Sequence, residues 1–525
     1  MTGVHRSELT PVAFLQRAAY VHPERIAVAH EDGRRMTYRE LEERSHRLAN
    51  ALRGRGLRHG DRVAVLSPNA PAILEAHYAV PLAGGVLVAI NTRLASPEID
   101  HIVRHSGARI LLVDHALEPL LEPLDLSGVD VVRIDDDGGA EDPYEQLVAE
   151  GGPELPESWL EYEEEPISIN YTSGTTGLPK GVTYTHRGAY LNALSEVIVA
   201  GLTPESAFLW TVPMFHCNGW CFPWAVTAVA ARHVTERSVD PGRIWELIEH
   251  EGVTHYNGAP TVHISVAGHP SARRLERPVT VLAAAAPPSP TLLARLQELN
   301  FRVVHVYGLT ETYGPITVSP EPDGFAELDA KARARVLARQ GQAYPTAELV
   351  RVVDADDADV PRDGATMGEV VMRGNNVMLG YHDDPEGTAQ AFRGGWFHSG
   401  DLAVWHPDGM IELRDRAKDV IISGGENIST IEVEQALASH PAVLECAVIA
   451  IPHDHWGERP KAFVTLREGA EVGPEELIEH CRARIARFKA PDAVEFGPLP
   501  KTSTGKVQKY VLRDREWGDR EKRIN

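Results

Sequence analysis

Short apolar segments alternate with helical patterns along the first part of the chain. In chain order, the expected elements are strand 61–66, helix 71–82, strand 85–90, helix 96–105 and strand 109–113. A second run begins at residue 167, with strands expected at 208–212, 279–282 and 302–306. Parallel strands need a helical crossover between them, so this alternation predicts parallel α/β layers.

The chain is too long for one ordinary hydrophobic core. It has 525 residues, so at least two domains are expected. Residues 345–414 contain short β segments with glycine and aspartate turns, which indicate a small barrel-like unit. A smaller α+β pattern follows. We therefore predict an α/β fold with an N-terminal body at 1–415, whose small β unit occupies about 345–415, and a smaller α+β domain at 416–525.

Charge and composition exclude several classes of protein. The net charge of −23 is spread along the chain, which disfavours nucleic acid as a partner. No apolar run reaches the roughly 18–20 residues of a membrane span, and the polar N-terminus has no secretion signal, so a cytoplasmic location is expected. Four cysteines make no disulfide framework. Although His216, Cys217 and Cys221 lie close in sequence, no second ligand pair is nearby, so buried free thiols are expected.

A loop rich in glycine and hydroxyl residues spans Tyr171–Val182. Glycines let a backbone approach a ligand closely, and hydroxyl and amide groups donate hydrogen bonds to phosphate oxygens. Lys180 adds a positive charge. A Walker loop would have glycine before its lysine, where this chain has Pro179. The segment therefore predicts a phosphate-binding loop of another type.

This loop resembles the phosphate-binding signature of the adenylate-forming superfamily, which includes acyl-CoA synthetases, adenylation domains of peptide synthetases and beetle luciferases. The resemblance covers essentially the whole chain, because further motifs follow in the family's order at 306–312, 396–401, 415–427 and 500–506. It implies an ATP-dependent acyl-CoA synthetase, most similar to those for short- and medium-chain fatty acids. Such an enzyme forms an acyl-adenylate and pyrophosphate, and then acyl-CoA and AMP.

The resemblance also assigns nucleotide contacts. Tyr307 would stack on adenine, Thr310 would contact the α-phosphate and Asp401 would hold the ribose hydroxyls. Glu311 would hold Mg²⁺, a hard cation that prefers carboxylate and phosphate oxygens. Alanines fill 283–286, where the family usually has glycines. The full nucleotide set is Thr172, Ser173, Gly174, Thr175, Thr176, Gly177, Lys180, Ala285, Ala286, Tyr307, Gly308, Asp401 and Arg416.

The C-terminal motifs resemble those of the C-terminal domain that moves during catalysis in the family. Lys506 matches the adenylation lysine on a mobile domain, and Lys418 matches the hinge about which that domain turns. The residues expected to line the coenzyme A channel are Ser423, Gly424 and Gly425. The residues expected to take part in catalysis are Lys506, Thr310, Glu311 and His216.

The segment 213–224 is expected to contact the acid. His216 matches a gate beside the substrate carboxylate, and Trp220 and Trp224 are candidates for the pocket floor. The segment has no acidic residue to pair with a substrate ammonium group, which argues against an amino acid. We expect a short- or medium-chain aliphatic acid, with aryl acids as the second choice.

Two other functions are compatible with this fold. A stand-alone adenylating enzyme would load an acyl or aryl acid onto a separate carrier protein instead of coenzyme A. A luciferase-like monooxygenase would need oxygen chemistry, which nothing in the sequence indicates. The expected partners are the acid, ATP and coenzyme A. A homodimer is the candidate assembly.

Overall fold

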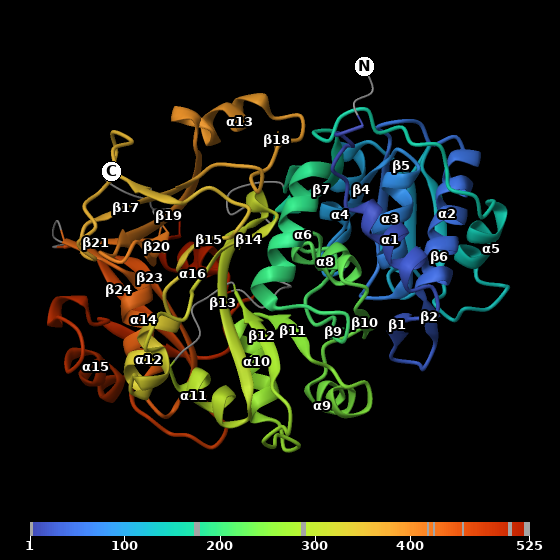
Figure 1. The fold of residues 1–525 in the computed structure, drawn as a ribbon. Helices are drawn as coiled ribbons and strands as arrows, with labels where there is room; N and C mark the ends of the chain where they lie inside the picture. Colours follow the sequence, from blue (N-terminus) through green and yellow to red (C-terminus); the bar gives the residue numbers. More distant parts are fainter. Residues whose placement is uncertain are drawn as a thin grey trace.

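The computed structural model describes residues 4–172, 179–284, 290–416, 419–423, 426–453, 456–501 and 507–518. Within these residues, two large sheets and their helices form the N-terminal body, and a smaller unit contains the C-terminal part (Figure 1). Among the described helices, none has the length and apolar character that a membrane crossing requires.

A seven-stranded sheet contains most of the strands from the first 185 residues. Across the sheet, its strands are β18 (Gly380–Tyr381), β8 (Lys180–Thr185), β7 (Pro166–Thr172), β4 (Val86–Ala89), β3 (Arg62–Leu66), β5 (Ala108–Asp114) and β6 (Asp130–Ile134). The neighbouring strands from β7 to β6 pair in parallel, whereas β7 and β8 form an antiparallel hairpin. The predicted parallel arrangement is confirmed.

A nine-stranded sheet forms the second layer. Across it, the strands are β15 (Gln342–Ala343), β14 (Gly314–Val318), β13 (Phe301–Leu309), β12 (Val279–Ala283), β11 (His255–Gly258), β9 (Ala207–Leu209), β10 (Arg232–Thr235), β1 (Ile26–His30) and β2 (Arg35–Thr37). The central strands from β13 to β1 are parallel. Their carboxyl ends therefore meet at one edge, where open α/β sheets bind ligands.

Helices fill the space between the sheets and cover their outer faces. The helices in the inner core are α1 (Val12–Val21), α2 (Tyr38–Gly54), α3 (Pro71–Leu82), α5 (Pro143–Glu150), α6 (His186–Ala200) and α8 (Phe222–Ala228). The helices on the outer faces are α4 (Ser96–Ser106) on the first sheet and α9 (Pro241–His250), α10 (Pro260–Gly268) and α11 (Pro290–Glu298) on the second. Along β3, Val63 and Val65 belong to the inner core and Ala64 and Leu66 to the outer one. Each sheet is thus buried on both faces, which explains its nearly continuous apolar strands.

The region 115–165 is acidic and shows little regular apolar pattern in the sequence. It nevertheless contains β6 and α5. Only two of the five residues of β6 are buried, because it is the edge strand of its sheet. An edge strand shows little of the apolar continuity by which a buried strand is recognised.

The small β unit is a four-stranded antiparallel sheet. Its strands are β16 (Arg351–Val353), β17 (Met367–Met372), β19 (Phe397–Trp405) and β20 (Ile411–Arg416). Beside it, α13 (Pro385–Ala391) contacts β18 and β19, whereas α12 (Ala330–Leu337) packs against α11. The 3₁₀ turns of the chain are η1 (Glu118–Leu121), η2 (Thr310–Thr312), η3 (Phe325–Glu327), η4 (Arg393–Gly395) and η5 (Arg487–Lys489).

The C-terminal part has its own sheet and its own core. The strands are β21 (Ile421–Ser423), β22 (Glu426–Ile428), β23 (Val443–His453), β24 (Gly457–Leu466) and β25 (Ala493–Phe496), and the helices are α14 (Thr430–Ala438), α15 (Pro474–Arg482) and α16 (Lys509–Trp517). Ser429 caps α14, accepting from the backbone N–H of Glu432. The separate core confirms a smaller α+β domain. The exact boundary at residue 415 stays a prediction.

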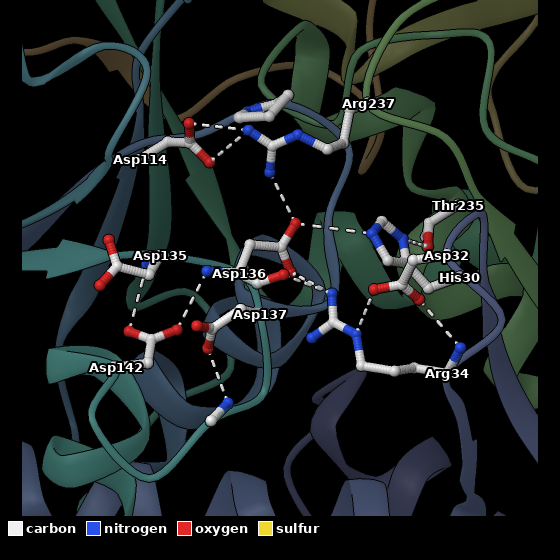
Figure 2. A network of polar contacts seen from close by, with 12 residues as sticks. His30, Asp32, Arg34, Asp114, Asp135, Asp136, Asp137, Asp142, Thr235 and Arg237 are labelled. Atoms are coloured by element: carbon white, nitrogen blue, oxygen red, sulfur yellow. Dashed lines mark hydrogen bonds and ion pairs between the residues drawn. The ribbon is translucent and has the colours of Figure 1, made fainter.

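Buried ion pairs tie the two large sheets together at the ends of four strands (Figure 2). Arg237, just after β10, donates to the fully buried Asp114 at 2.8 and 2.9 Å and to Asp136 at 2.6 Å. Asp136 also accepts from Arg34 at 2.8 Å and lies 3.5 Å from His30. Burial by itself would raise the pKa of Asp136, but these cationic and imidazole partners lower it. Arg237 therefore compensates two buried carboxylates that belong to the other sheet.

Replacing Arg237 should destabilise the body strongly. Arg237→Leu leaves Asp114 and Asp136 buried without their shared cation, so the free energy of unfolding should fall by about 3–5 kcal/mol. Urea unfolding followed by tryptophan fluorescence measures this. Arg133→Leu is the matched control, because Arg133 pairs with Asp135 at the surface and should change stability by only about 0–1 kcal/mol. Equal effects of the two substitutions would contradict the inter-sheet role of Arg237.

Candidate active site

The phosphate-loop motif connects the two strands of a hairpin. The last pairs of β7 with β8 are Tyr171 with Gly181 and Thr172 with Lys180. Thr172 and Lys180 therefore face each other where the loop leaves the sheet. The expected loop contacts Ser173, Gly174, Thr175, Thr176 and Gly177 lie outside the described residues.

The Val306–Thr312 motif runs from the carboxyl half of β13 into the turn η2. It places Tyr307 and Gly308 in the strand and Thr310 and Glu311 in the turn. A Cβ atom on Gly308 would lie 1.9 Å from the carbonyl oxygen of Gly314 on β14, so only glycine fits. This close approach of β13 and β14 fixes the position at which the chain leaves β13 and enters the turn that contains Glu311.

Tyr307, Asp401 and Arg416 form a connected set at the nucleotide side of the site. The Tyr307 hydroxyl donates to Asp401 Oδ2 at 2.7 Å, and Arg416 Nε lies 3.3 Å from Asp401 Oδ1. Asp401 on β19 and Arg416 on β20 are direct partners in the antiparallel pair. Burial, with the nearby Asp401 carboxylate, raises the pKa of Tyr307 far above its usual value, so its hydroxyl stays a donor.

Glu311 is held by a residue that the sequence analysis did not select. Its Oε1 accepts from the Tyr381 hydroxyl at 2.9 Å. Tyr381 lies on β18, which pairs with β8 and so comes beside the phosphate-loop hairpin. Lys180 lies 4.8 Å from the centre of the Tyr381 ring and donates to Asp384 at 2.8 Å. Burial raises the pKa of Glu311, partly opposed by Tyr381 and Arg416.

Thr310 links the nucleotide side to the expected acid side. Its carbonyl oxygen accepts from the Tyr184 hydroxyl at 2.5 Å, and its Oγ1 lies 3.5 Å from Cys217 Sγ. Cys217 directly follows His216, whose ring lies 3.8 Å from the same sulfur. His216 is only partly buried. The Cys217 sulfur therefore lies close to both His216 and Thr310; the roles expected of these two residues stay predictions.

A left-handed turn follows His216. All five residues of 217–221 have positive φ, from 42° at Asn218 to 63° at Cys221. The turn includes the short element α7 (Cys217–Trp220), whose handedness is therefore opposite to that of an ordinary helix. Each non-glycine residue in this conformation costs roughly 1–2 kcal/mol. Side-chain contacts must offset that strain.

Asn218 supplies the main buried contacts that stabilise the turn. Its backbone N–H donates to Asn170 Oδ1 at 2.9 Å, and its side-chain oxygen accepts from the Ser168 hydroxyl at 2.5 Å and from Asn170 Nδ2. Its side-chain nitrogen donates to His77 at 3.2 Å. Burial lowers the pKa of His77 to about 4, so the ring is neutral and can accept. The turn is thus fastened to β7, the strand that leads into the phosphate loop.

The aromatic and thiol side chains of this segment are buried. Trp220 packs at the start of β14, where a Cβ on Gly314 would come within 3.0 Å of its ring. Trp224 is fully buried and donates to the carbonyl oxygen of His77 at 3.3 Å. Burial raises the pKa of Cys217 to about 12, which keeps its thiol neutral. Among the described residues, no cluster of histidine, cysteine or acidic side chains could hold a metal by itself.

Several expected site residues lie outside the described part of the chain. These are Lys506, Lys418, Gly424, Gly425, Ala285 and Ala286. Ser423 is described; it lies on β21, and its hydroxyl is 3.4 Å from Arg459 Nη1. The roles of all these residues stay predictions.

No motif in the sequence marks Tyr381, Tyr184 or Asn218 as a residue of the site. Tyr381 lies about 70 residues after Glu311, its partner, and joins it only because β18 adds to the edge of the first sheet. Tyr184 directly follows the phosphate-loop motif, but its contact with Thr310 crosses between the two sheets. Only the Asn-Gly pair at 218–219, a common turn signal, could have marked the unusual backbone there.

Comparisons with known proteins agree with this geometry. The AMP-binding enzyme family matches residues 15–382, and the AMP-binding enzyme C-terminal domain matches residues 432–506. The acetate–CoA ligase CCL3 of Humulus lupulus is 43% identical, covering 96% of this chain and 94% of that protein. The 4-hydroxybutyrate–CoA ligase 2 of Metallosphaera sedula is also 43% identical, covering 98% and 95%. The crystal structure of ATP-bound MatB from Rhodopseudomonas palustris superposes with a TM-score of 0.87 at 27% identity, covering 97% and 99%.

Removing the Asn218 side chain should loosen the turn. Asn218→Ala leaves buried groups of Ser168 and Asn170 with fewer partners, so the free energy of unfolding should fall by about 1–3 kcal/mol. Urea unfolding measures this change. An alanine at the exposed Asn375 is the control and should stay within about 0.5 kcal/mol of the parent protein. A stability loss at Asn218 no larger than at Asn375 would show that the turn does not depend on this network.

Proposed function

This chain belongs to the AMP-binding enzyme family. From that premise we propose that it is an ATP-dependent acyl-CoA synthetase, and we propose which residues act in each of its two half-reactions. It is an AMP-forming acid–thiol ligase with ATP and coenzyme A as co-substrates. Its acid is a short-chain carboxylic acid, in keeping with relatives named for acetate and 4-hydroxybutyrate. Whether medium-chain acids also react stays a prediction.

One observation supports this proposal most directly. Four parts of the chain converge on one site: the β7–β8 hairpin, the β13–η2 turn, the short strand β18 and the β19–β20 pair. Two hydrogen bonds connect them, from Tyr307 to Asp401 and from Tyr381 to Glu311. A site that combines a carboxylate for ribose, an aromatic ring and a second carboxylate beside a phosphate loop fits a nucleoside triphosphate.

The nucleotide would be held by Asp401, Tyr307 and Arg416. The Asp401 carboxylate is oriented by both neighbours and still has lone pairs to accept from ribose hydroxyls. The Tyr307 ring would supply an apolar face for adenine. Arg416 pairs with Asp401 and would add positive charge near the phosphates.

The residues present fit Mg²⁺. Glu311 is an oxygen donor that is oriented by Tyr381 and lies beside the phosphate-loop hairpin. A magnesium ion bound there would neutralise charge on the phosphate oxygens. Burial favours the neutral form of Glu311, and a nearby cation would favour its ionised form.

The first half-reaction needs charge neutralisation rather than a general base. The acid is already ionised at neutral pH, so its oxygen can attack the α-phosphate directly. The chain's contribution would be the loop amides of 173–177, Thr310 and Lys506, each of which stabilises charge that develops on the α-phosphate. His216, close to Thr310 through Cys217, would position the carboxylate.

The second half-reaction would depend on the C-terminal domain. We propose that residues 416–525 pivot at Lys418, withdraw Lys506 and present Ser423, Gly424 and Gly425 to the pantetheine of coenzyme A. Trp220 and Trp224 are retained as candidate boundaries of the acyl pocket. The homodimer and the cytoplasmic location also stay predictions; light scattering and cell fractionation measure them.

Acid-dependent pyrophosphate release is the direct test of this function. With acids from acetate to palmitate, scored by kcat/KM, the optimum should fall at two to about six carbons, and coenzyme A should convert the adenylate to thioester. A holo carrier protein offered in place of coenzyme A tests the carrier-loading alternative, which the relatives do not favour. An optimum at palmitate, or activity only with the carrier, would reject the proposal.

Lys506 should separate the two half-reactions. Lys506→Ala removes the charge that stabilises the adenylation transition state, so adenylate formation should fall by about 100-fold or more. Thioester formation from supplied acyl-adenylate should be nearly unchanged. Lys501→Ala is the matched control, because Lys501 lies on the same segment but pairs with Glu445 at 2.6 Å. Equal loss of both half-reactions in the Lys506 variant would contradict the proposal that Lys506 acts only in adenylate formation.

A further inference from the structure

Two side chains among the described residues are buried with both polar atoms lacking a hydrogen-bond partner: Glu236 and Asn257. Glu236 has charged neighbours, including Arg243. Asn257 is fully buried on β11, at the carboxyl end of the central parallel strands. A buried amide that binds nothing is destabilising, so this residue needs an explanation.

The side chain of Asn257 points to the inner face of the nine-stranded sheet. Asn257 is in register with Leu282 on β12, and Leu282 is in register with Val304 on β13. Residues in register point to the same side of a sheet. Leu282 and Val304 both belong to the inner core, whereas Tyr256, the residue before Asn257, belongs to the outer one. The amide therefore faces the side on which Trp220 and the acid segment lie.

Both loops of the proposed site start next to Asn257. Its carbonyl oxygen accepts from the Thr211 hydroxyl, and residue 211 opens the segment that leads to His216. The carbonyl oxygen of the following Gly258 accepts from the backbone N–H of Ala284 at 3.3 Å. Ala284 belongs to the alanine run expected near adenine. Asn257 thus lies between the acid segment and the nucleotide loop.

We infer that Asn257 forms part of the floor of the acyl pocket and selects a short acid that carries a hydroxyl group on its tail. This inference rests on the proposed ligase function and specifies its substrate class. An amide offers a donor at Nδ2 and an acceptor at Oδ1, and a hydroxyl can accept from the first or donate to the second. A purely aliphatic tail would leave both atoms unpaired.

The selectivity has a clear physical origin. A pocket with a buried polar group rejects an analogue that cannot pair with it much more strongly than an apolar pocket rejects an added hydroxyl. Asn257 is the polar group in question, and its in-register neighbours Leu282 and Val304 are apolar. The hydroxyl of the substrate should therefore be recognised at one position along the tail.

Steady-state kinetics on matched acids tests this inference. The acids are butanoate and its 2-, 3- and 4-hydroxy derivatives, each with saturating ATP and coenzyme A. For the parent enzyme, kcat/KM with the best hydroxy acid should exceed that with butanoate by about 10- to 100-fold. Asn257→Leu keeps the branched shape but replaces the amide by apolar methyl groups, and it should bring this ratio to about 1 or below.

The stability of the variant distinguishes recognition of substrate from a structural role. Because the amide has no hydrogen-bond partner among the described residues, Asn257→Leu should leave the thermal midpoint unchanged or raise it. Asn257→Ala is the second variant and should lose the same preference. Tyr256→Phe is the matched control: it removes a polar atom from the same strand on the outer face and should keep the parent ratio.

Three outcomes would overturn the inference. The parent enzyme could use butanoate as well as every hydroxy acid, or both Asn257 variants could keep the parent ratio. Either result would reject the pocket assignment while ligase activity stands. Absence of coenzyme A-dependent turnover with any acid would reject the ligase function, and this inference with it.

Discussion

The hydrogen bond from Tyr307 to Asp401 connects the two sides of the proposed nucleotide site. Tyr307 lies near the carboxyl end of β13 in the nine-stranded sheet, and Asp401 belongs to the small antiparallel sheet nearly a hundred residues later. Arg416 holds the same carboxylate from the neighbouring strand. The two parts of the fold share one hydrophobic core, and within it this contact orients the carboxylate proposed for ribose relative to the ring proposed for adenine. The Glu311–Tyr381 bond fixes the phosphate side of the site in the same way.

Rigidity around the site comes from buried polar contacts that cross between the two large sheets. Arg237 ties their strand ends together at one place, and Asn218 fastens a strained left-handed turn to β7 at another. Such contacts are strong because water is excluded, and each member depends on its partners being present. The proposed substrate pocket between the sheets would therefore keep its shape. It would hold the amide of Asn257, which has no partner among the described residues, in place until a ligand binds.

Much of the site could be predicted from local motifs. The residues proposed to lie near the phosphates are at strand ends and in loops whose composition indicates their chemistry, so local motifs alone predict Thr172, Lys180, Tyr307 and Glu311. Tyr381 and Asn257 were not selected. A tyrosine or an asparagine on a short strand has many ordinary roles, and only the strand order and register show what each one faces.

By itself, the amino-acid sequence determined the α/β class of fold and the alternation of many of its strands and helices, and it predicted a phosphate loop, because these depend on local periodicity and on short motifs. The sequence did not predict the edge strand β6 or the handedness of the turn at 217–221. Only the tertiary structure decided which carboxylate meets which hydroxyl and which buried amide is left without a partner. Those relations join residues tens to hundreds of positions apart, and they follow from the packing of two sheets rather than from any pattern within one segment.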